Sequence, residues 1–314
     1  MDQILSFDTY RCCVLCPRMC RADRTKSVGF CGCTDTLTAA RAALHRWEEP
    51  CISGPYDQEQ GGSGAVFFSG CTLGCCFCQN AKISSGHFGK EITAGQLAQS
   101  FLRLQDQGAF NINLVTPTHY LPHIVSALDQ VRHRLTIPVL YNCGGYERVE
   151  TIAALKDYVD IWLPDLKYMD SQLSLRFSQA KDYFEAASAA ICQMISQTGS
   201  PVYQRREDVS LLSKGVIIRH MVLPGHREDS IALLQWMAGH LPKDQYLVSL
   251  MSQYTPYTKN SRYPELNRRI TSYEYNKVVE AALELGLTNG FMQERSSAKE
   301  EYTPPFNLEG LEGL

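Results

Sequence analysis

The stretch that decides the fold is Gly70-Cys71-Thr72-Leu73-Gly74-Cys75-Cys76-Phe77-Cys78-Gln79-Asn80. It contains the spacing Cys-x3-Cys-x2-Cys and directly follows an apolar run at residues 65–68. A short apolar run rich in Val and Phe predicts a buried strand, so the thiols are expected on the loop that leaves it. Three thiolates on one tight loop suit an iron–sulfur cluster. In a [4Fe–4S] cube, three protein ligands leave one iron open to a small molecule.

Two other interpretations of this loop are a zinc site and a group of core thiols without chemistry. Structural zinc sites usually take four ligands, often from two separated Cys-x2-Cys pairs. Core thiols have no reason to gather within one loop. The cluster is therefore the prediction.

The motif Cys71-x3-Cys75-x2-Cys78 after a strand, with Phe77 before the last cysteine, resembles the signature of radical S-adenosylmethionine (SAM) enzymes. The resemblance implies that the methionine amino and carboxylate groups of SAM bind the open iron. It also implies that an electron from the cluster cleaves the sulfonium to a 5′-deoxyadenosyl radical, which abstracts a hydrogen atom. Cys76 is a substitute for Cys75 or Cys78 in principle, but the family pattern leaves it as a small buried hydrophobe.

Composition indicates a globular protein with one large core. The chain has 314 residues, with 44% apolar and 20% charged residues and a net charge of −3. This balance gives no reason to expect nucleic acid or an anionic membrane as a partner. The first residues show no secretory signal, and no apolar run is long enough to span a bilayer. Thirteen cysteines without an export signal favour metal binding in a reducing cytoplasm over a disulfide framework.

A second group of cysteines precedes the loop. Cys13, Cys16, Cys20 and Cys31 form the spacing Cys-x2-Cys-x3-Cys-x10-Cys. Four thiolates at such spacing predict a compact second site, either tetrahedral zinc or a closed iron–sulfur centre. A structural metal would also explain how a short segment with few aliphatic residues folds. The alternative is a surface arm with incidental cysteines, and the substitute ligands are Cys12 and Cys33.

We expect four parts along the chain: a Cys-rich arm at 1–36, a connector at 37–63, a main domain at 64–290 and a tail at 291–314. The Ala-rich residues 37–44 predict a short helix. The adjacent carboxylates Glu48 and Glu49 diverge, so they are expected to be a solvated pair rather than acid–base groups. A Gly-rich linker is expected at 58–64. The tail has paired prolines that exclude a helix, and Phe306 and Leu308 are its candidate anchors on the main domain. The alternative is a frayed tail.

Apolar runs alternate with helical patterns from residue 64 onward. The expected strands are at 65–69, 112–116, 138–142, 161–164, 216–221 and 246–251. Helical patterns cover 121–131, 149–158, 168–198, 230–240 and 272–285, and Thr93 can N-cap a further helix. Repeated strand–helix units predict an α/β fold with a parallel sheet. The units are too few for a closed eight-strand barrel, and the resemblance implies a partial (βα)6 TIM-like barrel. Such a barrel places its active site at the carboxyl ends of the strands.

The second strand ends in Thr116-Pro117-Thr118-His119, where radical SAM enzymes commonly carry Gly-Gly-Glu-Pro to hold the SAM amino group. No acid is present, so the Thr116 and Thr118 hydroxyls or backbone carbonyls are expected to accept from the ammonium. His119 is interpreted as an ordinary partly buried histidine, the alternative being a pocket proton donor. The third strand ends at Asn142, a further candidate for SAM binding. The segment Gly144-Gly145-Tyr146-Glu147 after it is expected to be a turn.

The fourth and fifth strands carry charged residues. Asp165-x-Lys167 resembles a motif of pyruvate formate-lyase-activating enzymes. This resemblance implies that Asp165 helps to hold a cation near the SAM carboxylate and that Lys167 faces SAM. Residues two apart on a strand point to the same side, and the alternative is a rim salt bridge. Arg219 inside an apolar strand is costly unless it is paired or meets a ligand, and the resemblance directs it to the SAM carboxylate. Tyr254 after the sixth strand is a candidate pocket residue.

The resemblance covers residues 64–290, and the Cys-Pro-Arg-x-Cys motif at 16–20 resembles a less-studied branch of relatives of the activating enzymes. It implies a cytoplasmic enzyme that abstracts a hydrogen atom from a glycine of a partner, a glycyl radical enzyme. A flavodoxin- or ferredoxin-type protein would supply the electron. One alternative substrate is a small molecule or another peptide. The non-enzymatic alternative is an iron–sulfur redox carrier or sensor.

Overall fold

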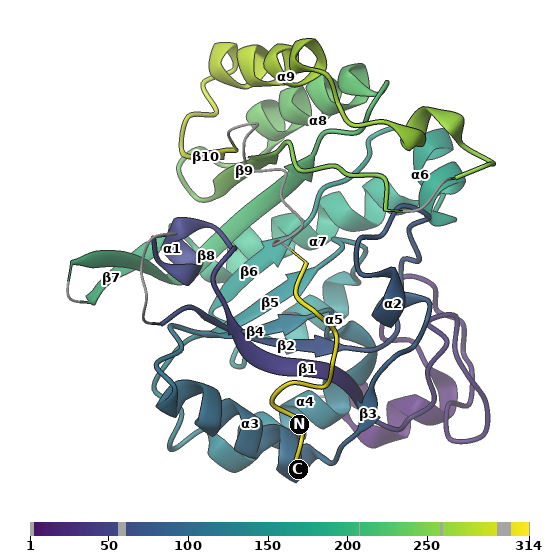
Figure 1. Cartoon of the computed structure of the whole chain (residues 1–314), viewed down its shortest axis with the longest axis vertical. Coiled ribbons are helices and arrows are strands. Elements are labelled where there is room, and N and C mark those ends of the chain that lie inside the picture. Colours follow the sequence, from purple (N-terminus) through teal and green to yellow (C-terminus); the bar gives the residue numbers. More distant parts are fainter. Residues whose placement is uncertain (1–2, 56–60, 207, 258–259, 294–302, 314) are drawn as a thin grey trace.

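The computed structural model describes residues 3–55, 61–206, 208–257, 260–293 and 303–313. Its strands form a mixed sheet with the order β10-β9-β8-β6-β5-β4-β2-β1-β3 (Figure 1). The strands from β10 to β2 pair in parallel. The strand bounds are β1 (Thr38–His45), β2 (Ser63–Phe68), β3 (Lys90–Glu91), β4 (Ile112–Val115), β5 (Val139–Cys143), β6 (Ile161–Pro164), β7 (Val202–Arg206), β8 (Val209–Met221), β9 (Leu247–Met251) and β10 (Gly290–Met292). Because the described sheet ends at β10 and β3, it is a partial barrel, and the predicted fold class is confirmed.

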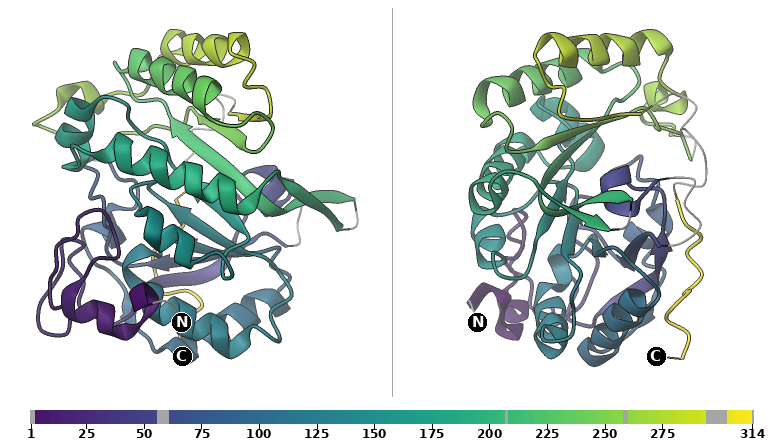
Figure 2. Two further views of the ribbon diagram at one scale, coloured as in Figure 1. Left: turned by 180° about the vertical axis from the view of Figure 1, so that it is seen from behind. Right: turned by 90° about the vertical axis from the view of Figure 1, so that its left-hand side faces the viewer.

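Helices cover the outer face of this curved sheet, as the front and rear views show (Figures 1 and 2). They are α3 (Ala94–Asp106), α4 (Leu121–Val131), α5 (Val149–Ala154), α6 (Ser171–Ser178), α7 (Tyr183–Thr198), α8 (Arg227–His240) and α9 (Ser272–Glu284). Shorter helices are α1 (Pro50–Ser53) and α2 (Ala81–Ser84), and 3-10 turns lie at Gln3–Leu5, Phe7–Cys12, Thr118–Tyr120 and Pro264–Asn267. Thr93 caps α3 through a capping box with Gln96, as its position predicted. No helix within the described ranges is long and apolar enough to cross a membrane.

Two predicted helices are corrected. Residues 37–44 were expected to be helical because alanine favours helices, but they form β1, which pairs antiparallel with β2. Most of β1 is buried, so packing on both faces of the strand overrides the local preference. The expected single helix at 168–198 is divided into α6 and α7. The break follows Gln179, which adopts a left-handed conformation with φ 53° and ends α6.

Helix α1 of the connector packs against apolar side chains of four strands of the sheet. Cys51 and Ile52 of α1 are buried in one cluster with side chains from β5, β6, β8 and β9. The members from these strands include Leu140, Leu163 and Ile217. Only part of the expected linker, residues 61–64, lies within the described residues, since 56–60 fall outside them.

The C-terminal strap, residues 303–313, lies against β1 and β2 (Figure 1). The Leu308 N–H donates to the Ala40 carbonyl at 3.1 Å, and the Ala42 N–H donates to the Glu309 carbonyl at 2.9 Å. Phe306 is buried against Phe67, with ring centroids 5.4 Å apart. The expected docking of the tail therefore holds for these residues, while 294–302 lie outside the described part of the chain.

Candidate active site

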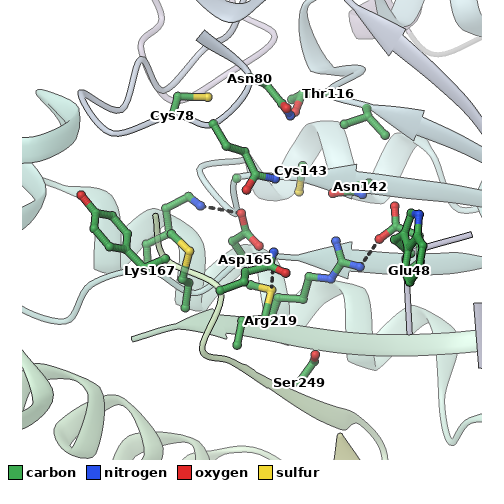
Figure 3. A pocket seen from close by; sticks show the side chains of 18 of the residues that line it. Glu48, Cys78, Asn80, Thr116, Asn142, Cys143, Asp165, Lys167, Arg219 and Ser249 are labelled. Atoms are coloured by element: carbon green, nitrogen blue, oxygen red, sulfur yellow. Dashed lines mark hydrogen bonds and ion pairs between the residues drawn. The ribbon is translucent and has the colours of Figure 1, made fainter. Parts of the chain in front are cut away.

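A cavity of about 960 Å³ opens at the carboxyl ends of the parallel strands (Figure 3). Most side chains that the sequence proposed for the site line it, although they come from six separate segments. They are Cys71, Cys75, Phe77, Cys78, Thr116, Asn142, Asp165, Lys167, Arg219 and Tyr254. The fold thus brings together the cysteine loop and the ends of β4, β5, β6, β8 and β9, as a parallel barrel requires.

The cysteine loop is held in shape around its three sulfur atoms. The Leu73 N–H donates to Cys71 Sγ at 3.4 Å. The Ser178 hydroxyl donates to Cys75 Sγ at 3.1 Å, and the Ser84 hydroxyl donates to Cys78 Sγ at 3.4 Å. Hydrogen bonds to ligand sulfur atoms orient the ligands and tune a bound cluster. Each of the three thiols has such a donor.

Phe77 anchors the same loop through aromatic packing. Its ring makes edge contacts with Tyr168, Phe177 and Tyr254, at centroid distances of 6.4, 6.3 and 6.0 Å. Such edge-to-face packing fixes ring orientation as well as burying area. Phe77 therefore joins the cysteine loop to α6 and to the segment after β9.

Cys71 and Cys75 lie in surroundings that disfavour a free thiolate. Burial raises the pKa of Cys71, and it raises the pKa of Cys75 to about 12 although the Lys167 charge opposes the shift. A metal centre supplies the positive charge that buried thiolates need. Among the described residues, no group of three or more His, Cys, Asp or Glu is placed to hold one metal ion. The ligands of a cube bind different irons and need not converge on one point.

Cys76 corrects one expectation for the loop. It was expected to be buried, but its side chain is exposed. The Cys76 N–H donates to the Phe177 carbonyl at 2.8 Å, which fixes the backbone at this point while the thiol reaches the surface. Cys76 also does not line the cavity, unlike its neighbours Cys75 and Cys78.

Asp165 and Lys167 form an ion pair in the cavity wall. Lys167 Nζ lies 2.5 Å from Asp165 Oδ2, and the two side chains are 16% and 21% exposed. Burial alone would lower the pKa of Lys167, but the Asp165 carboxylate together with Cys75 and Cys78 outweighs it, and the pKa is raised. The Tyr183 hydroxyl from α7 accepts from the Lys167 N–H at 2.9 Å and donates to the Asp165 carbonyl at 3.0 Å. The strand end that presents the pair is therefore fixed from behind.

Glu48 and Glu49 overturn a second expectation. They are buried, and both are paired with Arg219 instead of being solvated. Arg219 Nε donates to Glu49 Oε1 at 2.8 Å, and Nη2 donates to Glu48 Oε2 and to Glu49 Oε2. The prediction that the adjacent carboxylates diverge is wrong, because both reach the same guanidinium nitrogen of Arg219. A ligand carboxylate would have to displace one of them to reach Arg219.

In the group formed by Arg219, Glu48 and Glu49, the buried charges also compensate one another. Burial works to raise the pKa of Glu48, but the charges of Arg219 and His45 and the hydrogen bonds from Arg219 and Asn113 together outweigh it, and the pKa is lowered. Glu48 Oε1 also accepts from Asn113 Nδ2 at 2.8 Å. Two carboxylates share one guanidinium, so this end of the cavity carries an excess negative charge.

Thr118 does not reach the cavity. It is fully buried, and its hydroxyl donates to Glu147 Oε1 at 2.7 Å. Burial raises the pKa of Glu147 to about 8. The expected turn at 144–147 is present, with Gly145 at φ 78°, and it directs Glu147 into this separate network. His119 is a buried histidine bonded through Nε2 to the Ser69 carbonyl at 2.7 Å, which fits the simpler of its two interpretations.

The cavity wall also contains polar side chains that the sequence reasoning missed. Asn80 lines it, and the Asn80 Oδ1 atom is buried without a hydrogen-bond partner within the described residues. Its position directly after the cysteine loop was the available signal. Trp47 and Ser249 line the cavity as well, but no local pattern marked them.

The four arm thiols lie near one another. Cys13, Cys16 and Cys31 are buried and Cys20 is exposed. A Cβ atom added to Gly29 would lie 3.4 Å from Cys20 Sγ and 3.5 Å from Cys31 Sγ, so these two sulfurs flank the same glycine. Burial raises the pKa of Cys16, and Cys13 and Cys31 add to the shift, which places all three within electrostatic range. The substitute ligands differ, because Cys12 is exposed and Cys33 donates to the Ser69 carbonyl at 3.4 Å.

Comparison with known proteins gives a family and several distant likenesses. A sequence model described as the radical SAM superfamily matches residues 65–237, which is more than half of the chain. An uncharacterized protein of Methanocaldococcus jannaschii is 29% identical over 284 residues, covering 87% of this chain and 75% of that protein.

Two solved structures are similar at low identity. Streptococcus suis SuiB bound to the precursor peptide SuiA is 14% identical with a TM-score of 0.48, over 71% of this chain and 46% of SuiB. The chain thus spans about half the length of SuiB. Methylornithine synthase (PylB) is 15% identical with a TM-score of 0.48, over 76% of this chain and 68% of that chain.

Proposed function

The chain belongs to the radical SAM superfamily, and from this premise we propose that Cys71, Cys75 and Cys78 hold a [4Fe–4S] cluster beside a SAM molecule in the cavity. When bound, these groups supply the 5′-deoxyadenosyl radical that abstracts a hydrogen atom from a substrate. The observation that carries the proposal is the position of three hydrogen-bonded thiols at one wall of a cavity of about 960 Å³.

The remaining cavity residues bind and orient SAM in this proposal. Lys167 is the cation placed to meet the SAM carboxylate, and Asp165 keeps it charged and directed into the cavity. The acid that usually receives the SAM amino group is absent. Thr116, Asn142 and the unpaired Asn80 Oδ1 are the acceptors available in its place. Arg219 contributes indirectly, by holding Glu48 and Glu49 in the wall.

For the substrate, we favour a glycine Cα of a partner glycyl radical enzyme, with a flavodoxin- or ferredoxin-type electron donor in the cytoplasm. The support is the Asp165-x-Lys167 motif and the turn Val222-Leu223-Pro224-Gly225, which directly follows β8 and has the Val-x-Pro-Gly pattern of the activating enzymes. Gly225 ends that turn, and its N–H donates to Glu274 Oε1 at 2.7 Å. Both features resemble pyruvate formate-lyase-activating enzymes.

A second candidate is radical chemistry on a small molecule or another peptide. One observation favours it: the connector supplies Trp47, Glu48 and Glu49 to the cavity wall. The resulting negative charge, close to an indole ring, suits a substrate with a cationic group.

The arm is proposed to hold a second centre through Cys13, Cys16, Cys20 and Cys31. The ligand set is supported by Cys20 and Cys31 flanking Gly29 and by the influence of Cys13 and Cys31 on the Cys16 thiol. Among the described residues no three such side chains converge on one ion, so the arm would have to tighten around zinc or a closed iron–sulfur centre. The carrier or sensor alternative has less support, because carriers normally close their cluster with four cysteines and need no Asp-Lys pair in a cavity.

The test is anaerobic reconstitution with iron and sulfide, followed by dithionite and SAM, with 5′-deoxyadenosine as the product measured. The wild type is expected to form it, and the Cys71→Ala/Cys75→Ala/Cys78→Ala variant is expected to form none. Cys76→Ala is the matched control, since this thiol is in the same loop but exposed. It should retain the activity. No product from the wild type would support the sensor, and a glycyl radical signal on an added partner would select the first substrate class.

A further inference from the structure

Arg18, inside the Cys16-Pro17-Arg18-Met19-Cys20 turn of the arm, donates hydrogen bonds to four backbone carbonyls elsewhere in the chain. Its Nε meets the Thr72 carbonyl at 3.1 Å, and its Nη2 meets the Leu73 carbonyl at 3.0 Å. The same Nη2 meets the Ser178 carbonyl at 2.8 Å, and Nη1 donates to the Gln179 carbonyl. Thr72 and Leu73 belong to the cysteine loop, and the other two carbonyls end helix α6.

The guanidinium is fixed from the arm side as well. It lies 3.8 Å from the centroid of the Phe30 ring, directly before Cys31, and 5.1 Å from that of Tyr146. The turn that carries it is closed by the Met19 N–H donating to the Cys16 carbonyl at 3.0 Å. Met19 has a φ of 38°, a left-handed conformation that a non-glycine residue adopts only when its surroundings demand it. Two of the proposed arm ligands, Cys16 and Cys20, flank this strained turn.

The carbonyls that accept from Arg18 are directly linked to the loop thiols. Ser178, whose carbonyl accepts from Arg18, donates through its hydroxyl to Cys75 Sγ at 3.1 Å. Phe177, one residue earlier, accepts from the Cys76 N–H. Arg18 therefore caps the carboxyl end of α6 and holds the cysteine loop against it. Without this cation, four carbonyls in two converging segments lose their donor.

From this geometry we infer that the Cys16–Cys20 turn is a metal-dependent clamp: a metal on the arm thiols fixes Arg18, and Arg18 orders the Cys71–Cys78 loop for cluster binding. The inference rests on the proposed function for both ligand sets. Arg18 is a positioning residue, since its guanidinium acts through backbone carbonyls of the cysteine loop and of the end of α6. Its planar fork of donors suits four acceptors in a way that a lysine ammonium does not.

The clamp predicts a one-way dependence between the two metal sites. We would reconstitute the full chain anaerobically with Fe²⁺, Zn²⁺ and sulfide, measure iron, zinc and sulfide per chain, and record the EPR spectrum of the reduced loop cluster. Arg18→Gln should keep the arm metal but bind the loop cluster about 10-fold more weakly, a typical loss for a residue that supports metal ligands. Arg18→Lys should bind the loop cluster with an affinity between those of the wild type and Arg18→Gln.

The cysteine variants test the direction of the dependence. Cys16→Ser/Cys20→Ser should lose the arm metal and show the same weakened loop cluster as Arg18→Gln. Cys71→Ala/Cys75→Ala/Cys78→Ala should lose the loop cluster and keep the arm metal. The matched control is Arg11→Gln, because Arg11 is in the same arm but is 74% exposed and paired only with Asp8 among the described residues. It should behave as the wild type.

Three outcomes would overturn the clamp. They are a wild-type arm that holds no metal, a loop cluster in Arg18→Gln that matches the wild type in content and spectrum, and an arm that loses its metal whenever the loop does. Retained arm metal also shows that Arg18→Gln has folded. If the wild type fails to cleave SAM while the one-way dependence holds, the proposed function fails and the clamp stands. If SAM is cleaved and the one-way dependence is absent, the proposed function stands and the clamp fails.

Discussion

Asp165–Lys167 and Arg219–Glu48–Glu49 line the same cavity, but their members lie at very different separations along the chain. The first pair is 2 residues apart at one strand end. The second joins β8 to the connector across 170 residues. The first balances one charge with one, whereas the second places two carboxylates on one guanidinium and is more deeply buried.

This difference indicates that Asp165–Lys167 serves ligand binding, whereas Arg219–Glu48–Glu49 serves the stability of the fold. A local, partly accessible pair can exchange contacts with a ligand without disturbing the fold. The long-range group ties the connector to the barrel, and its charges are compensated within the group, with help from His45 and Asn113. The same chemical types therefore serve two purposes, and substitutions should separate the purposes by their effects on activity and on stability.

The largest effect is expected for Arg219→Met. This change leaves two adjacent buried carboxylates without their cation, and breaking such a group costs about 3–5 kcal/mol. Urea unfolding at pH 7 measures it. Adding Glu48→Gln and Glu49→Gln to Arg219→Met should recover much of the loss, because the uncompensated charges are then gone. A loss below about 1 kcal/mol would place Arg219 among weak surface pairs instead.

Lys167→Gln should show the opposite profile. Removing a preorganised charge that faces the cofactor should lower the rate of SAM cleavage about 100-fold, while the free energy of unfolding falls less than in Arg219→Met. The 5′-deoxyadenosine assay and urea unfolding on the same preparation give both values. Lys277→Gln is the control, because Lys277 forms an exposed pair with Glu280. Equal losses of activity in Lys167→Gln and Lys277→Gln would contradict a role in binding.

The pH dependence of stability should divide between the two groups. The lowered pKa of Glu48 gives stability that is present above its ordinary pKa of about 4.3 and lost as the pH falls through the lowered value. The raised pKa of Lys167 gives stability that is present below about 10.4 and lost as the pH rises through the raised value. Urea unfolding at a series of pH values, from the acid to the alkaline side of neutrality, measures both declines.

Arg219→Met and Lys167→Gln should each remove one of these two declines in stability, which we call the acid limb and the alkaline limb. In Arg219→Met, burial of Glu48 is no longer opposed by the cation, so acidification should stabilise the protein instead of weakening it. Lys167→Gln should flatten the alkaline decline and leave the acid limb. An unchanged acid limb in Arg219→Met would assign it to other carboxylates.

The smallest effect is expected for Asn113→Ala. It removes the amide that donates to Glu48 Oε1 and should cost about 1 kcal/mol, the usual contribution of one such bond. Thermal or urea unfolding measures it. The cost should vanish in a Glu48→Gln background only if the two side chains act as a pair, which a double-mutant cycle decides.

Features encoded within a few residues could be predicted from the sequence. The loop thiols and the Asp165–Lys167 pair each lie within one strand end and its following loop, so strand periodicity was enough to place them in one cavity. The parallel fold followed from the alternation of strands and helices in the same way. Local spacing carries this information because neighbouring residues share one backbone geometry.

Features that depend on contacts between distant segments could not be predicted from the sequence. Nothing near Glu48 and Glu49 shows that the connector folds back to Arg219, so a solvated pair was the reasonable local interpretation. The alanines of 37–44 favour a helix until β2 offers a strand to pair with. Thr118 lies at the correct strand end, yet its rotation into the Glu147 network depends on the segment after β5. These cases share one cause, which is a partner far away in sequence.

The C-terminal strap has a consequence for how the chain folds during its synthesis. Its Glu309 meets Arg41 of β1 across 268 residues, and its backbone bonds continue along the side of β1 where β3 ends. During translation, β1 emerges well before residues 303–313, so the backbone groups that bond to the strap stay unpaired until that segment has been made. An unpaired strand is a template for association with other chains. Nascent molecules should therefore depend on chaperones until the strap arrives to cover them.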